Sequence, residues 1–184
     1  MQFGAPSACL VPRRDRFTGQ GRSPYPTVSG ATLEGVSLVP GGFVPPTPVE
    51  TDAFRLALLG PEYNESDYSA WTSSMDFIRS LPGWGTSSWP EPMTIEDNLR
   101  DCVSHLERSN SGRDFAYTAL LPDRDEVVGC VYFKPTRPPR PGTVDVRSWV
   151  TEEHSNLDKP LYEAVTRWLA EDWPWSVVEY APRR

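Results

Sequence analysis

The fold is decided by one stretch, residues 143–150, which reads TVDVRSWV. Side chains of a β-strand alternate between its two faces. Small and apolar side chains share one face of this strand: Val144, Val146, Ser148 and Val150. The opposite face carries Asp145, Arg147 and Trp149. We therefore predict a strand with one core face and one face that combines charge with an aromatic ring.

A helix and one further strand follow this stretch. The helix is predicted over 158–171, since Asp158 and Pro160 suit its first turn. Its apolar side chains recur at helical spacing: Leu161, Val165, Trp168 and Leu169. Residues 175–180 are predicted as the last strand, so the unit should form a right-handed parallel crossover.

The residues before 143 supply three more strands and two helices. Short apolar runs predict strands at 54–59, 115–121 and 127–133, the last two as a hairpin. One helix is predicted from Ser66 or Asp67 to about residue 81, and a capping box at Thr94 and Asp97 opens another. The second helix should bury its apolar residues: Ile95, Leu99, Cys102, Val103 and Leu106. The order β-α-α-β-β-β-α-β predicts an α/β fold, a mixed sheet with helices on both faces.

The chain of 184 residues divides into a leader and one domain. Residues 1–49 hold 8 Pro and 7 Gly and show no apolar periodicity, which is typical of a disordered segment. We therefore expect a disordered leader at 1–49 and a folded domain at 50–184. No apolar run of about 18 residues occurs, so we expect no membrane-spanning helix.

Charge and cysteine content exclude several classes of protein. The net charge of −7 argues against a nucleic-acid partner, because phosphate backbones select basic surfaces. Cys9, Cys102 and Cys130 share no metal-binding spacing, which predicts neither a zinc site nor a disulfide framework. We expect a cytoplasmic protein without a metal, with Cys102 and Cys130 as small core residues. His105 is expected to face solvent.

The element order, with 143–150 and the helix after it, resembles the GCN5-related N-acetyltransferase (GNAT) superfamily over roughly residues 54–181. A narrower likeness to small bacterial acetyltransferase-like proteins rests on segments 67–74, 88–90 and 172–174. The resemblance implies that acetyl-CoA lies where strand 143–150 and the last strand separate. Strand amides freed by a bulge would then polarise the thioester, and a carboxylate would take a proton from the attacking amine. The diphosphate would lie on amides at the start of the crossover helix.

The resemblance also implies the site residues. Contacts to acetyl-CoA would come from the strand and the turn after it: Trp149, Val150, His154, Ser155, Asn156, Leu157 and Lys159. Asp145 or Glu62 would act as base, and Tyr180 or Tyr132 would protonate the departing thiolate. Trp71, Trp89 and Arg147 would line the substrate pocket, with Arg147 positioning an acidic group. The acceptor would be a small-molecule amine.

Two departures from the family pattern leave a second interpretation open. The family turn reads Gln/Arg-x-x-Gly-x-Gly/Ala, whereas residues 153–159 contain no glycine, and Glu152, Glu153 and Asp158 would repel a diphosphate. The chain also ends four residues past Tyr180, so we expect a domain shortened at its C-terminus relative to the family. An open sheet edge would then favour a homodimer.

Two functions therefore remain open. One is an acetyl-CoA-dependent N-acetyltransferase that works by direct attack, and the other is a non-catalytic binding or interaction module of the same fold. Asp145 and Arg147 are also consistent with a structural ion pair or with a solvated strand face, because charges on a strand face are usually paired or solvated.

Overall fold

The computed structural model describes residues 37–85 and 87–183. The elements follow in chain order: β1 (Arg55–Leu58), the 3-10 helix η1 (Pro61–Tyr63), α1 (Asn64–Thr72), α2 (Met75–Ser80), α3 (Ile95–Asn110), β2 (Phe115–Leu120), β3 (Val127–Pro135), β4 (Thr143–Val150), the 3-10 helix η2 (Ser155–Leu157), α4 (Asp158–Asp172) and β5 (Val177–Tyr180). In this part of the chain the strands form one five-stranded sheet in the order β1-β2-β3-β4-β5. The predicted α/β fold and its mixed sheet are confirmed.

The pairing of β4 differs on its two sides. β3 runs antiparallel to it along its whole length, from Gly129 opposite Val150 to Pro135 opposite Val144, without a register shift. β5 runs parallel to β4, as predicted for the crossover, and pairs only with Thr143–Val146. The second half of β4 therefore extends past the end of β5.

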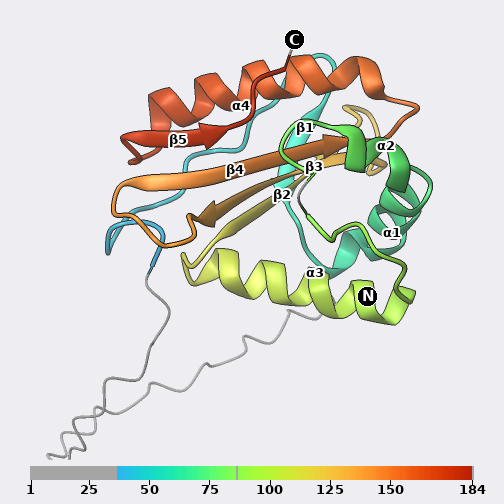
Figure 1. Cartoon of the computed structure of the whole chain (residues 1–184), viewed down its shortest axis with the longest axis horizontal. Coiled ribbons are helices and arrows are strands. Elements are labelled where there is room, and N and C mark those ends of the chain that lie inside the picture. The colour runs from blue at the N-terminus through green and yellow to red at the C-terminus, as the bar shows by residue number, and fades with distance from the viewer. Residues whose placement is uncertain (1–36, 86, 184) are drawn as a thin grey trace, which may run out of the picture. The chain divides into compact units, whose positions relative to one another are not determined.

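Two apolar cores lie on opposite faces of the sheet. Figure 1 shows α4 on one side of the sheet and α1 and α3 on the other. Val144, Val146 and Val150 share the first core with the apolar face of α4. Trp149 belongs to the second core, with Trp71 of α1 and residues of α3 and β3. The predicted alternation of side chains along β4 is confirmed.

The single helix predicted from Ser66 or Asp67 is wrong. The chain instead forms η1, then α1 and α2, with a break at Ser73 and Ser74. The Ser73 hydroxyl donates to the Ala70 carbonyl, and the Ser74 hydroxyl accepts a bond from the Glu152 amide. Serine hydroxyls offer the backbone such alternatives to helical bonding, and the 3.6-residue period alone did not reveal them.

The capping box of α3 is confirmed, since the Asp97 amide donates to Thr94 Oγ1 at 3.1 Å. The predicted buried face of α3 is wrong in part. Leu99 and Val103 are 40% and 39% exposed. The residues that turn toward the sheet are largely polar: Asn98, Cys102, His105 and Ser109. Their steps of 4, 3 and 4 are helical, but a search for apolar residues passes over them.

The folded domain begins before residue 50, which corrects the predicted boundary. Val39 lies in the core beside α4. The Leu38 amide donates to the Gly112 carbonyl at 2.7 Å, and the Trp175 indole donates to the Leu38 carbonyl at 2.9 Å. The rest of the predicted leader, residues 1–36, lies outside the described residues. The described helices are all too short or too polar to reach across a lipid bilayer.

Candidate functional site

A wedge opens between β4 and β5 where their pairing stops at Val146 and Tyr180. The Thr151 amide donates to the Val128 carbonyl at 2.9 Å. Because backbone groups of a strand alternate in direction, Ser148 and Val150 direct theirs away from β3, toward the wedge. β5 ends at Tyr180, so the pairing stops where the resemblance implies that the strands separate, and β4 shows no bulge against β3.

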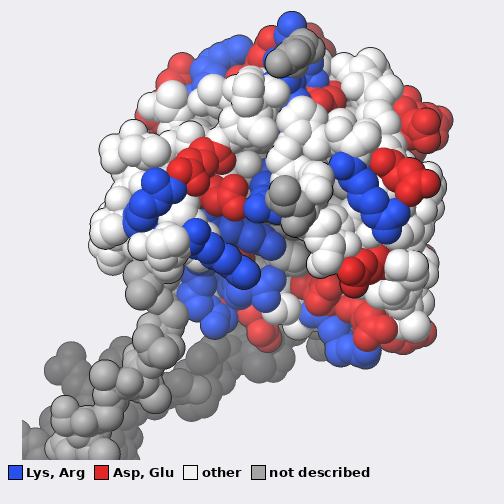
Figure 2. Space-filling view, viewed as in Figure 1, with Lys and Arg blue, Asp and Glu red and all other residues white. Residues whose placement is uncertain are grey.

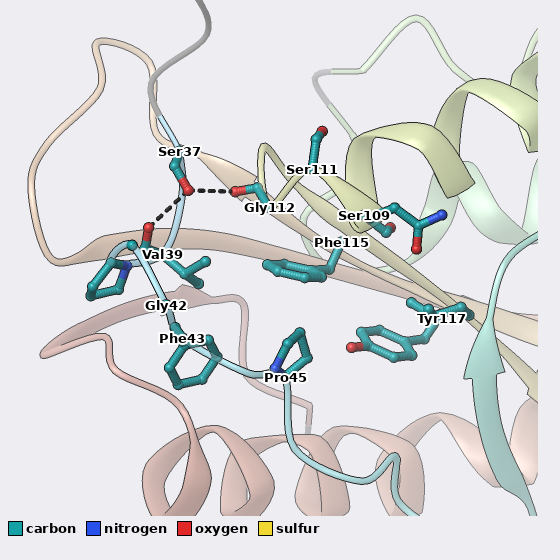
Figure 3. A pocket seen from close by; sticks show the side chains of 14 residues that line it. Ser37, Val39, Gly42, Phe43, Pro45, Ser109, Ser111, Gly112, Phe115 and Tyr117 are labelled. Carbon is teal, nitrogen blue, oxygen red and sulfur yellow. Dashed lines mark hydrogen bonds between the residues drawn. The ribbon is translucent and has the colours of Figure 1, made fainter. Parts of the chain in front are cut away.

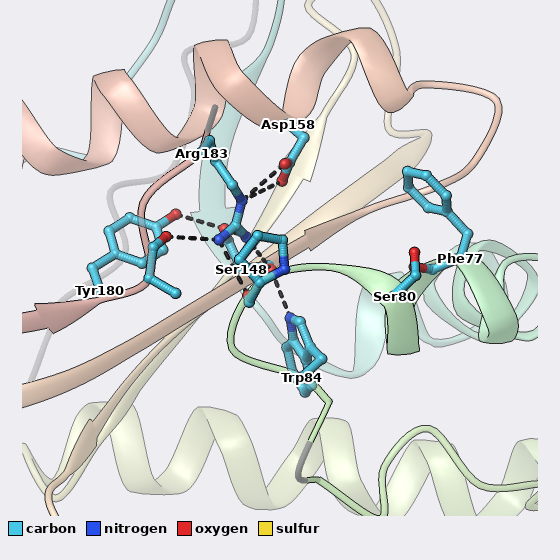
Figure 4. A network of polar contacts seen from close by, with 9 residues as sticks. Phe77, Ser80, Trp84, Ser148, Asp158, Tyr180 and Arg183 are labelled. Carbon is cyan, nitrogen blue, oxygen red and sulfur yellow. Dashed lines mark hydrogen bonds and ion pairs between the residues drawn. The ribbon is translucent and has the colours of Figure 1, made fainter.

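The Arg183 side chain occupies this wedge, as Figure 4 shows. Its Nη2 donates to Ser148 O at 3.0 Å and to Ser148 Oγ at 3.1 Å, while Nε donates to Asp158 at the start of α4. Nη1 donates to the carbonyls of Pro82 and Ala181. Only 2% of the side chain is exposed. The guanidinium is thus bonded to β4, to α4 and to the loop after α2 at once.

Tyr180 and Trp84 complete the polar contacts of the wedge (Figure 4). The hydroxyls of Tyr180 and Ser148 lie 2.5 Å apart. Burial raises the pKa of Tyr180 to about 12, against the opposing effects of the Ser148 hydrogen bond and Arg183. The Trp84 indole donates to Ser148 O at 2.7 Å. Two donors, Trp84 and Arg183, therefore share one carbonyl of β4.

Most backbone amides of the turn between β4 and α4 are already hydrogen-bonded, either within the turn or to neighbouring segments. The amides of Thr151, His154, Ser155 and Leu157 all donate to carbonyls, and the Glu152 amide donates to Ser74 Oγ. The Asp158 amide donates to the Ser155 carbonyl. Leu157 is buried, whereas the side chains of Ser155, Asn156 and Lys159 are exposed. An anion at this turn would meet side chains rather than a cradle of free amides.

A cavity of about 870 Å³ lies on the α3 face of the sheet, next to the wedge. Residues from α3, β3, β4, β5 and the loop before α3 line it. Its lining combines aromatic and charged side chains, among them Trp84, Trp89, His105, Lys134, Arg137, Asp145 and Arg147. Figure 2 shows basic side chains gathered in a hollow on this face. The volume is in the range of small-molecule sites.

Most charges of the cavity are paired. Arg147 Nη2 lies 3.4 Å from Asp145 Oδ2, and Arg108 Nε lies 2.8 Å from Asp114 Oδ2. Glu179 pairs with Arg140 at the rim. Asp145 and Arg147 thus do form the ion pair that the sequence left open, and both also line the cavity.

An aromatic wall forms the other part of the cavity. The Trp84 and Trp89 ring centroids are 4.9 Å apart, and those of Trp84 and Tyr132 are 6.1 Å apart. His105 lies over Tyr132 at 5.4 Å, and its Nδ1 is 3.0 Å from Arg108. Burial, then Arg108 and Lys134, lower the pKa of His105 to about 3. His105 is therefore a neutral cavity residue, and the expectation that it faces solvent is wrong.

The structure brings some of the predicted site residues together and leaves others apart. Trp89, Asp145 and Arg147 line the cavity. Trp71 is 1% exposed and lies behind Trp89, where its indole donates to Asn98. Glu62 is exposed on η1 and is not among the residues that line the cavity.

The two strand residues predicted to contact acetyl-CoA are completely buried. The side chains of Trp149 and Val150 pack into opposite cores, so only the backbone of Val150 faces the wedge. His154 bonds to Thr151 within the turn.

Sequence reasoning missed Lys134, Arg137 and Arg183. Lys134, at the end of β3, and Arg137, in the loop after it, belong to no motif, and only the register of Lys134 opposite Asp145 places them at the site. Arg183 lies beyond the last predicted strand, and no local pattern indicated its ion pair with Asp158.

A smaller cavity of about 360 Å³ lies elsewhere, between residues 37–45 and the start of β2 (Figure 3). Ser37 Oγ donates to the Val39 and Gly112 carbonyls there. Gly112 has φ 67°, and a Cβ at this position would lie 3.2 Å from Ser37 Oγ, so the contact depends on glycine. Its lining residues include one titratable side chain, Tyr117, whose pKa burial raises above the usual range, and no acidic or basic side chain. It therefore carries no chemistry of its own.

Within the described residues, no group of three His, Cys, Asp or Glu side chains could hold a metal ion. Cys102 and Cys130 are free and buried, as expected of core residues.

No protein-family model matches the sequence, and no curated protein matches it significantly. Solved structures do match the fold. A ribosomal L7/L12 alpha-N-protein acetyltransferase in its apo form is 11% identical, with a TM-score of 0.55 and 73% of each chain covered. The same enzyme bound to coenzyme A is 11% identical, with a TM-score of 0.53 over 68% of this chain and 70% of that one.

Two further structures agree. The ribosomal-protein-S5-alanine acetyltransferase from Vibrio fischeri is 13% identical, with a TM-score of 0.53 over 67% of each chain. A GNAT-family acetyltransferase from Bacillus anthracis is 11% identical, with a TM-score of 0.52 over 70% of this chain and 69% of that one. The fold of the chain is therefore that of the GNAT acetyltransferases, which confirms the resemblance at the level of fold.

Proposed function

We propose that this protein is an acetyl-CoA-dependent N-acetyltransferase that acts on a small-molecule amine. The observation that supports this most directly is that β5 ends at Tyr180 and leaves β4 unpaired on that side after Val146, next to a cavity that Asp145 and Arg147 line. A fold shared with acetyltransferases agrees with it. The L7/L12 and S5-alanine acetyltransferases act on ribosomal proteins, but the cavity of about 870 Å³ favours a small acceptor here.

The wedge fits a pantetheine arm only after Arg183 has left it. At present the guanidinium fills the space beside Ser148 and leaves 2% of its surface exposed. Acetyl-CoA and Arg183 would thus occupy the wedge alternately. The turn does not fit a diphosphate through backbone amides, since most of them are already bonded. Side chains of His154, Ser155, Asn156 and Lys159 would have to hold it.

The roles of the chain's own residues follow from their positions. Asp145 would accept the proton of the amine, and Arg147 would hold that carboxylate at 3.4 Å. The raised pKa of Tyr180, about 12, keeps its phenol protonated and able to donate a proton toward the wedge. Only Ser148 and Val150 direct backbone groups there, so the strand contacts would come from these two.

A second candidate function is a binding module of the same fold without catalysis. The filled wedge and the bonded amides of the turn favour it. In that case the cavity would still bind a ligand, but acetyl-CoA would bind neither the wild type nor a variant that lacks the Arg183 side chain.

Thiol release from acetyl-CoA, measured over a panel of amines and a peptide with a free N-terminus, tests the proposal. We expect release with a small amine, and Asp145→Asn to lower kcat by about 100-fold or more with the acetyl-CoA Kd unchanged. Asp76→Asn is the matched control, because Asp76 is an exposed surface residue paired with Arg79. Release only with the peptide would overturn the small-molecule acceptor. No release with any acceptor would favour the binding module.

A further inference from the structure

Two cations of the cavity have no acidic partner. The other basic residues that line it, Arg108 and Arg147, each pair with an aspartate. Neither Lys134 nor Arg137 forms an ion pair with any residue that the structure describes. Both extend from the end of β3 and the loop after it, at one end of the cavity.

The surroundings of Lys134 favour an anion. Lys134 is exposed, but partial desolvation of its ammonium lowers its pKa, and Arg108, Arg147 and Arg137 lower it further against the opposing effect of Asp114. Three guanidinium groups thus lie close enough to repel its ammonium. This end of the cavity is therefore positively charged, although the whole protein has a net charge of −7. A bound anion would relieve that repulsion.

The rest of the cavity offers flat apolar contacts toward the wedge. Trp89 and Tyr132 have ring centroids 6.5 Å apart, and Trp84 lies beside both. Trp84 also donates to Ser148 O, so the wall ends at the wedge. A chain that runs along these rings therefore connects the cationic end with the strand where acyl transfer would take place.

The register gives the length of such a ligand. Lys134 lies opposite Asp145, and Ser148 lies three residues further along β4. At about 3.3 Å per residue, the two positions are roughly 10 Å apart. An α-amino acid, whose amine and carboxylate share one carbon, is too short to reach both.

We propose that the acceptor amine carries a carboxylate or phosphate at the far end of an extended chain. The anion binds Lys134 and Arg137, the chain lies on Trp84 and Trp89, and the amine reaches Ser148. This assignment rests on the proposed function, because the amine end is defined by the acyl-transfer position. Since Asp145 lies opposite Lys134, about 10 Å from that amine, Asp145 would take the amine's proton only through intervening water.

Tryptophan fluorescence and calorimetry test binding without acetyl-CoA, since two tryptophans line the cavity. The probes are 6-aminohexanoate, 6-aminohexyl phosphate and hexylamine, which differ in the anionic group. We expect either anionic probe to bind at least tenfold more tightly than hexylamine. Lys134→Ala and Arg137→Ala should each weaken the anionic probe about tenfold and leave hexylamine unchanged. Arg124→Ala is the control, because Arg124 is exposed in the β2–β3 turn and pairs with Glu126.

Comparison of the carboxylate and phosphate probes identifies the preferred anion, which is the one carried by the probe with the lower Kd. Equal affinity of hexylamine and both anionic probes would overturn the proposal, as would unchanged binding in both cavity variants. Measurement of thiol release from acetyl-CoA distinguishes a failure of the proposed anion site from a failure of the proposed function. Tight anionic binding without release contradicts the enzyme but supports the anion site, whereas release at equal kcat/KM from hexylamine and 6-aminohexanoate supports the enzyme and contradicts the site.

Discussion

Removal of the Arg183 side chain should have opposite effects on stability and on acetyl-CoA binding. The guanidinium donates to five oxygen-bearing groups: Ser148 O, Ser148 Oγ, Pro82 O, Ala181 O and the Asp158 carboxylate. Loss of one partner from a buried ion pair costs about 3 kcal/mol or more. Arg183→Ala should therefore lower the melting temperature by about 6–12 °C in a domain of this size.

The same contacts oppose the entry of acetyl-CoA. A ligand that displaces Arg183 must break them, whereas Arg183→Ala has nothing to displace. If the full 3 kcal/mol opposes binding, the variant should bind acetyl-CoA up to about 100-fold more tightly. Isothermal calorimetry measures the affinity, and a thermal melt of the same samples measures the stability.

Two variants make the result specific. Arg183→Lys can keep the contact with Asp158 but cannot reproduce the planar fork toward Ser148, so its affinity should lie between wild type and Arg183→Ala. Arg124→Ala removes the same charge from an exposed turn and should change neither quantity. A lower melting temperature with unchanged acetyl-CoA affinity would refute the alternate occupancy of the wedge.

Two other predictions concern the core and the sheet edge. Burial raises the pKa of Asp67 to about 6, so the folded state holds its proton more tightly than the unfolded state and loses stability as pH rises from about 4 to 6. Asp67→Asn should remove that loss, so at pH 7 its free energy of unfolding should be up to about 3 kcal/mol above that of the wild type. Urea titrations of both proteins at pH 4 and pH 7 measure these free energies. A difference between variant and wild type that is equal at the two pH values would contradict the prediction. At the β5 edge, Val177 and Val178 are 48% and 36% exposed, so we expect sedimentation equilibrium to detect a weak dimer. The double change Val177→Lys and Val178→Lys should abolish this dimer. A wild type that stays monomeric at all concentrations would refute the prediction.

Much of the fold was predictable because it depends on local patterns. Alternation along β4 separates Val144 and Val146 from Asp145 and Arg147, and that separation decides which face meets α4. The capping box at Thr94 fixes the start of α3 within the chain itself. Each of these signals spans only a few residues.

The site was predictable only where it lies on such a pattern. Asp145, Arg147 and Trp89 were found, because strand alternation and the Trp-rich loop before α3 point to them. His105 was misplaced, since a polar stripe on a helix looks like a solvent face unless the partner ring of Tyr132 is known. Arg183 was missed because its partners Ser148 and Asp158 are 35 and 25 residues away. An ion pair between residues far apart in the chain produces no periodic pattern in the sequence.

The wedge and the cavity are joined through a single atom, Ser148 O. This carbonyl accepts from Trp84 at 2.7 Å and from Arg183 at 3.0 Å, which uses both of its lone pairs. When Arg183 leaves, Trp84 still satisfies the carbonyl, so the aromatic wall need not move. Under the proposed function, opening of the wedge would therefore leave the acceptor cavity intact, and either ligand could bind first. An acyl-CoA arm in the position of Arg183 would meet Ser148 Oγ, released from Arg183 but still bonded to the Tyr180 hydroxyl, and both hydroxyls would lie near a departing thiolate.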